Sequence, residues 1–134
     1  MKKVLTLLLI AFVMLSCGFK NREKPYIVLS NANVNTQAVN RLERVFSVGQ
    51  RVHYAVVVPQ GFKYSGVRMQ ISKQDDKTSN WGFSIISTED IYVAKSDTEY
   101  RSYIVPKLSG HYIIQFFYLN NKRYPFAHKE FIVQ

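Results

Sequence analysis

The stretch LSGHYIIQFFY, residues 108–118, decides the fold class. From Gly110 onward its positions are almost all apolar or aromatic, and a polar turn follows at residues 120–122. A short apolar run that is rich in aromatic and β-branched residues and bounded by turn residues is typical of a buried strand. Residues 127–134, AHKEFIVQ, follow the turn as a second predicted strand. The sequence therefore predicts a pair of adjacent strands at this end of the chain.

The same pattern recurs toward the N-terminus in short segments separated by turn residues. In residues 66–73, Val67, Met69 and Ile71 alternate with polar residues. Such alternation predicts a strand with one buried and one exposed face. Residues 36–46 are predicted as a short helical turn leading into a strand. The remaining predicted strands are residues 26–30, 51–58, 81–86, 91–94 and 100–105, so we expect an all-β chain of seven or eight strands.

Tyr112 lies near the start of the penultimate strand, two residues before Ile114. In this the chain resembles immunoglobulin-like β-sandwiches, in which a tyrosine at this place forms a corner two residues before the second cysteine of antibody domains. The resemblance covers residues 25–134 and implies one antiparallel sandwich. Trp81 falls after the strand that holds the core tryptophan of antibody-type domains. A related sandwich, such as a transthyretin-like one, stays open as an alternative.

The core must stabilise this domain without cross-links. Cys17 is the single cysteine, which excludes an intramolecular disulfide framework and a Cys-based zinc site. A domain of about 110 residues buries about two-thirds of its unfolded surface, which is enough. The predicted core consists of Val52, Tyr54, Val56, Val67, Met69, Ile71, Phe83, Ile85, Tyr112, Ile114, Phe116, Phe131 and Val133.

Residues 1–16 have the pattern of a secretory signal peptide, with Lys2 and Lys3 before an apolar run at residues 4–14. As a helix this run would be roughly 16 Å long, whereas crossing a bilayer takes about 20 residues. We therefore expect it to be cleaved. A buried N-terminal helix or an uncleaved anchor is the alternative. Its removal lowers the formal charge from +9 to +7.

The tetrapeptide Met14-Leu15-Ser16-Cys17, followed by Gly18, resembles the lipobox of bacterial lipoproteins. The resemblance implies cleavage before Cys17, a diacylglycerol on its thiol and an acyl chain on the new amine. Each buried methylene contributes about 0.8 kcal/mol, so two or three chains anchor a protein stably. Residues 17–24 would tether the domain to the membrane of the cell envelope. Gly18 in place of aspartate favours the outer membrane where the cell has two. The alternative to lipidation is that Cys17 is a small hydrophobic residue buried in the protein.

No catalytic constellation is evident in the sequence. There is neither a Gly-x-Ser-x-Gly elbow nor a glycine-rich phosphate loop, and the acidic residues 75–76, 89–90 and 97–99 lie in predicted turns. We expect no enzyme activity, no metal and no cofactor beyond the lipid on Cys17. The alternative is a small envelope hydrolase or ligand carrier, which would place a histidine and a carboxylate in a deep pocket. The scattered histidines are His53, His111 and His128.

Basic residues are spread along the chain without forming a run, and an exported protein rarely meets nucleic acid. An anionic headgroup, a glycan phosphate or an acidic envelope protein is the more plausible partner. Aromatic rings lie beside basic residues in predicted loops, and we consider them candidate contacts with a partner. The alternative is that these rings close the ends of the sandwich core. The sequence thus predicts a lipid-anchored, non-catalytic binding, scaffold or assembly module that acts through strand edges and loops. The candidate contact residues are Phe62, Tyr64, Lys122, Arg123, Tyr124 and Phe126.

Overall fold

The computed structural model describes residues 23–31, 44–75 and 82–134. The predictions for the signal peptide, Cys17, most of the tether, the helical turn at 36–43 and Trp81 lie outside these ranges. None of the described segments is a helix that could cross a bilayer. The strands are β1 (Tyr26–Ser30), β2 (Val45–Phe46), β3 (Val52–Val57), β4 (Gly66–Gln74), β5 (Phe83–Tyr92), β6 (Glu99–Ile104), β7 (Gly110–Tyr118) and β8 (Ala127–Val133).

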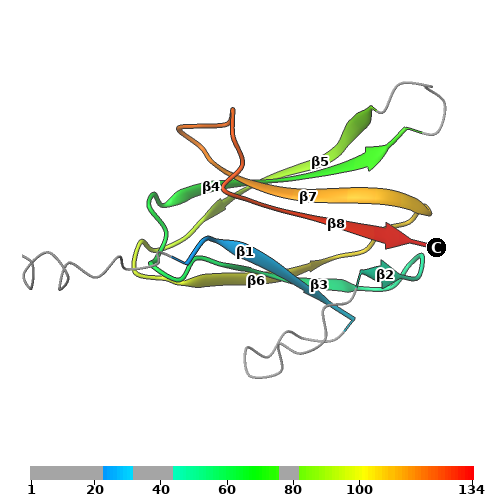
Figure 1. The fold of residues 1–134 in the computed structure, drawn as a ribbon, viewed down its shortest axis with the longest axis horizontal. Coiled ribbons are helices and arrows are strands. Elements are labelled where there is room, and N and C mark those ends of the chain that lie inside the picture. Colours follow the sequence, from blue (N-terminus) through cyan, green and yellow to red (C-terminus); the bar gives the residue numbers. More distant parts are fainter. Residues whose placement is uncertain (1–22, 32–43, 76–81) are drawn as a thin grey trace, which may run out of the picture.

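Two sheets pack face to face, as Figure 1 shows. One has three strands in the order β1-β3-β6, and the other has five in the order β2-β8-β7-β4-β5. Neighbouring strands are antiparallel except β2, which runs parallel to β8. The predicted sandwich is therefore confirmed, with one short parallel pair at an edge.

The core lies between the sheets and is rich in aromatic side chains. The rings of Tyr112 and Phe131 stack with their centroids 5.2 Å apart. The ring of Tyr54, from the other sheet, lies 5.7 Å from that of Phe116. The predicted core residues are buried except Phe83 and Ile85, which are 36% and 60% exposed, so these two predictions were wrong.

A β-bulge explains both exceptions. The β4–β5 register shifts between Ile71 and Ser72, which leaves Ile86 as an extra residue on β5. One extra residue moves every side chain beyond it to the opposite face of the sheet. Phe83 and Ile85 therefore lie on the outer face of the five-stranded sheet instead of the inner one.

β5 is one strand of 10 residues, whereas the sequence predicts two shorter strands and a turn here. Residues 87–90 pair with β4 throughout, so Glu89 and Asp90 are strand residues and their predicted place in a turn was wrong. Arg68 on β4 donates to Asp90 across the pair, with 2.7 Å between Nε and Oδ1. This hydrogen bond holds the pKa of Asp90 below its ordinary value. The cross-strand partner therefore stabilises a polar strand that local sequence does not favour.

Tyr112 forms the predicted corner. Its hydroxyl donates to the carbonyl oxygen of Leu108 at 2.6 Å, while its ring is 2% exposed. Burial raises the pKa of the phenol, and this effect exceeds the opposing effects of Lys73 and of the hydrogen bond to Leu108. The corner thus joins the loop before β7 to the core.

Candidate functional site

The two lateral sides of the sandwich differ. On one side β1 packs against β8. On the other side, among the strands of residues 23–31, 44–75 and 82–134, β5 and β6 are the last of their sheets and pair with β4 and β3 respectively (Figure 1). An edge strand presents unpaired backbone N–H and C=O groups to its surroundings. Within the described part of the chain, this side, which we call the open edge, therefore has two rows of such groups.

Three polar residues at inner positions of these strands help to explain why the edge stays open. Ser87 and Glu89 on β5 pair with the buried residues Ile71 and Met69 on β4, and directly opposite residues share a face of the sheet. On β6, Ser102 occupies an inner position as well, opposite Tyr54. Polar inner side chains gain little from being buried, so they do not draw the two sheets together here.

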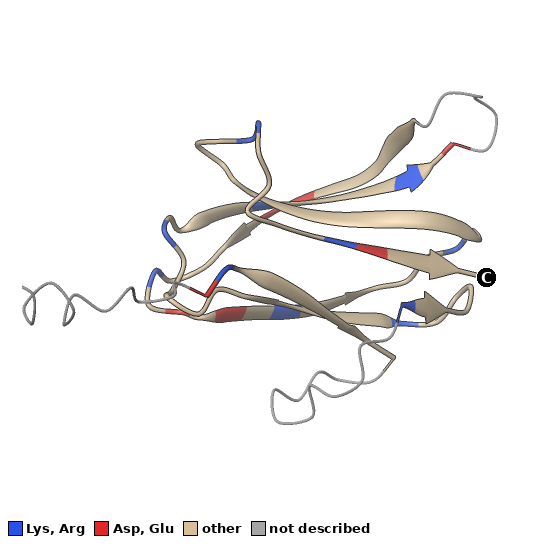
Figure 2. Ribbon diagram, viewed as in Figure 1, with Lys and Arg blue, Asp and Glu red and all other residues tan. Residues whose placement is uncertain are grey.

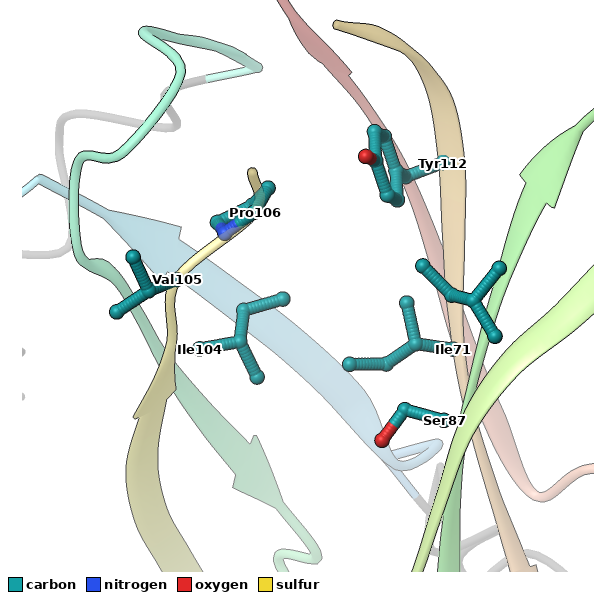
Figure 3. Close-up of a pocket in the computed structure, with 7 residues that line it drawn as sticks. Ile71, Ser87, Ile104, Val105, Pro106 and Tyr112 are labelled. Carbon is teal, nitrogen blue, oxygen red and sulfur yellow. The ribbon is translucent and has the colours of Figure 1, made fainter. Parts of the chain in front are cut away.

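A cleft of about 250 Å³ opens between the sheets at this edge (Figure 3). Ile86, the extra residue of the bulge, is 54% exposed and lines its rim. Bulges commonly re-aim a side chain in this way. Small-molecule sites are usually about 300–1,000 Å³, so the cleft suits one or two apolar side chains better than a cofactor. The lining residues are Ile71, Ile86, Ser87, Ile104, Val105, Pro106 and Tyr112.

Glu89 continues the open edge beyond the cleft on the same face of β5. Its negative charge acts on the buried phenol of Tyr54, whose pKa is raised mainly by burial and further by Tyr100 and Glu89, against a hydrogen bond with Ser102. Glu89 itself is exposed. Within the part of the chain that the structure describes, Glu89 forms no ion pair. The open edge thus has an apolar part and an acidic part.

The loops that hold the predicted contact residues meet at one end of the sandwich. The ring of Phe62 lies edge-on to that of Phe126 with centroids 6.5 Å apart, and Tyr64 lies edge-on to Tyr118 at 5.3 Å. Phe62 is only 3% exposed, and Phe126 packs against the core. These two rings plug the end of the core.

The other four predicted contact residues are exposed at the same end. Tyr124 is 65% exposed, and the guanidinium carbon of Arg123 lies 5.4 Å from its ring centroid. Tyr64 has the ammonium of Lys63 above its ring at 5.5 Å. Figure 2 shows basic residues in loops at both ends of the sandwich, so basic charge does not distinguish this end from the other.

The histidines lie away from the cleft. His111 is within 3.2 Å of Glu130 between Nε2 and Oε2, but both side chains face solvent on the outer face. His53 packs against the ring of Tyr103, and His128 is exposed. No histidine lines the cleft. Among residues 23–31, 44–75 and 82–134, no group of three His, Cys, Asp or Glu side chains could hold a metal ion.

Comparison with solved structures identifies the fold. An immunoglobulin-like protein from Pseudomonas aeruginosa superimposes with a TM-score of 0.54 at 8% identity, over 85% of this chain and 99% of that one. The fold is immunoglobulin-like. The soluble domain of PmoD from a Methylocystis species superimposes with a TM-score of 0.51 at 12% identity, over 82% and 90% of the two chains. No protein-family model and no curated protein matches the sequence.

Local sequence patterns do not predict the cleft. The available signal is the polar run at residues 87–90 between two apolar segments, a pattern that predicts a turn. If this run is treated as a strand, alternation places Ser87 and Glu89 at inner positions. Their polar side chains add little to the packing at this edge of the core. The bulge at Ile86 has no comparable signal, because it depends on the register with β4.

Proposed function

We propose that this protein is a lipid-anchored module of the cell envelope that binds an extended segment of another envelope protein along the open edge, without catalysing a reaction. The observation that carries the proposal is the apolar cleft between two strand edges that no other described strand covers. An added strand gains main-chain hydrogen bonds from a free edge, and pockets for its alternate side chains provide specificity. The open edge of this domain offers both.

The chemistry of the cleft favours binding. Its polar groups are the hydroxyls of Ser87 and Tyr112, and the second already donates to Leu108. General acid–base or nucleophilic catalysis needs an activating base within hydrogen-bond reach of the reacting group. The cleft lining contains no His, Asp, Glu, Lys or Cys that could act as this base.

The path of the chain is compatible with anchoring and binding together. Tyr26 pairs with Val57, so the chain enters β1 at the end of the sandwich where β3 finishes. A tether to lipid at Cys17 would hold the domain by this end, in the outer membrane where the cell has two. The open edge, on the side of the sandwich, would remain accessible to a neighbouring protein.

Site-specific crosslinking in intact cells tests the binding surface. A photoreactive amino acid at Ile86 in the full-length protein should give a discrete adduct. The same group at Ile132, which is 44% exposed and lies on β8, should give none. Equal labelling from both positions, or none from Ile86, would contradict binding at the open edge.

Anchoring is tested separately with Cys17→Ser. We expect this variant to keep its signal peptide or to leave the membrane fraction, because thiol acylation requires the cysteine sulfur. Fractionation, detergent partitioning and intact-mass measurement of both proteins would show the change. A mass that differs from the wild type only by the exchange of sulfur for oxygen, together with unchanged membrane retention, would rule out the lipoprotein hypothesis.

A further inference from the structure

We infer that the open edge selects an extended segment in which an apolar side chain and a lysine or arginine stand two residues apart, with the apolar side chain in the cleft and the basic one facing Glu89. The inference rests on the proposed function, because it specifies the partner of the same surface. It depends on the alternation of side chains along a strand, on the composition of the cleft and on the position of Glu89.

The first step is the geometry of an added strand. A strand paired with β5 would lie about 4.7–4.9 Å from it, and every second side chain would point toward the space between the sheets. Ser87 and Glu89 are consecutive inner residues of β5. A segment that places one inner side chain beside Ser87 therefore places the next beside Glu89, two residues away. This holds for either strand direction.

The second step is the preference of the cleft. Figure 3 shows Ile104 and Pro106 on one side, facing Ile71 and Tyr112 on the other. Ile71 and Tyr112 are buried, and Ile86 forms an exposed rim. An apolar side chain that enters between them would be removed from water, and it would also cover part of the exposed side chain of Ile86. A charged side chain would lose its hydration without gaining a partner there.

The third step is the acidic position. Glu89 and Asp90 are adjacent on β5 but point to opposite faces, and Asp90 on the outer face is already paired with Arg68. Glu89 faces the inner side, where it influences Tyr54. A charge at an inner position of an edge strand would lose hydration when a strand is added beside it, and an opposite charge on that strand offsets this cost. Leaving such a charge unpaired with the wrong partner is a common source of specificity in protein recognition.

The same charge disfavours a second copy of this protein as the occupant. Two β5 strands paired antiparallel about this acidic end would bring the carboxylates of Glu89 and Asp90 toward those of the other copy. Like charges across a strand pair are destabilising. A segment carrying Lys or Arg at that position gains an ion pair instead.

Peptide binding to the mature, lipid-anchored protein in detergent micelles tests the inference. The probes are three fluorescent peptides of about nine residues, long enough to span the strand, on a Ser/Thr background. The first carries Leu and Lys two positions apart, the second replaces Lys with Glu, and the third replaces Leu with Ser. Fluorescence anisotropy should show the first binding at least about threefold more tightly than either of the others.

Charge-reversal variants with matched controls complete the experiment. Glu89→Lys should reverse the preference between the Lys and Glu peptides, while Asp90→Lys, the same change on the outer face, should not. Ile86→Ser should weaken binding of the Leu/Lys peptide roughly five- to tenfold. Ile85→Ser, the neighbouring change on the outer face, should leave that affinity unchanged.

The outcomes separate the inference from the proposed function. One outcome is that Ile86→Ser weakens binding, while the Lys and Glu peptides bind equally and Glu89→Lys has no effect. In that case the inferred partner is wrong, but binding at the open edge is still supported. Failure of all three peptides to bind overturns the inference, and the crosslinking at Ile86 then decides the proposed function alone.

Discussion

At the scale of single residues, Tyr112 combines apolar and polar stabilisation. Its ring stacks on Phe131 in the core, and its hydroxyl donates to the carbonyl oxygen of Leu108 at 2.6 Å. A buried tyrosine needs such a partner, because an unsatisfied hydroxyl would offset part of the benefit of burying the ring. The residue also lines the cleft, so the same side chain supports the fold and the proposed site.

Tyr112→Phe should lower the free energy of unfolding by about 1–2 kcal/mol, since it removes the hydrogen bond and leaves a carbonyl group without its partner. Urea denaturation followed by circular dichroism measures the change. Tyr92→Phe is the control, because Tyr92 is 76% exposed and its change should be near zero. Equal stability of the two variants would show that the corner hydrogen bond is not stabilising.

At the scale of elements, the turn after β3 depends on Gly61. Its φ of 83° lies in the left-handed region, and its N–H donates to the carbonyl oxygen of Val58 at 2.8 Å. A Cβ atom at Gly61 would lie 2.7 Å from the carbonyl oxygen of Lys95, a backbone atom of the β5–β6 loop. This close approach holds two loops together at the end of the sandwich where Phe62 closes the core.

Gly61→Ala should therefore destabilise the domain more than Gly49→Ala. Gly49 has a similar φ of 79° but open space around it, so alanine there adds only backbone strain of about 1–2 kcal/mol. At Gly61 the clash with Lys95 adds to that strain. Thermal unfolding of the two variants gives the comparison, and a smaller loss at Gly61 would contradict the close approach of the loops.

At the scale of the whole molecule, both sheets contribute buried phenols to the core. Tyr54 on β3 and Tyr112 on β7 both have pKa values raised above 10.0, with burial as the largest cause. In the unfolded chain these phenols ionise near the ordinary value, while in the folded domain they stay neutral. Ionisation therefore favours unfolding, so the stability present below the ordinary pKa is lost as pH rises toward the folded pKa.

The free energy of unfolding should accordingly fall as the pH rises from about 9 to 11. Urea midpoints measured across this range test the expectation. Tyr54→Phe should make the decline shallower, because one phenol no longer ionises on unfolding. Tyr92→Phe, the same exchange at a residue that is 76% exposed, is the control and should keep the wild-type slope. A pH-independent midpoint would contradict this account.

Much of the architecture could be predicted from local patterns. The strands at residues 26–30, 66–73 and 127–134 and the corner at Tyr112 agree with the structure, because alternation and turn residues act over a few neighbours. The tyrosine corner was also sufficient to suggest the sandwich. The polar strand at residues 87–90 was missed because its stability comes from pairing with β4 and from Arg68, which is distant in the sequence.

The candidate site shows the same division. The sequence by itself determined an all-β chain with an alternating core and with Tyr112 at its corner, since these depend on the chemistry and spacing of near neighbours. Only the tertiary structure decided that Ile86 forms a bulge, that Phe83 and Ile85 face outward, and that β5 and β6 leave an apolar cleft beside Glu89. Register and edge position are properties of paired strands, so they arise only when distant segments meet.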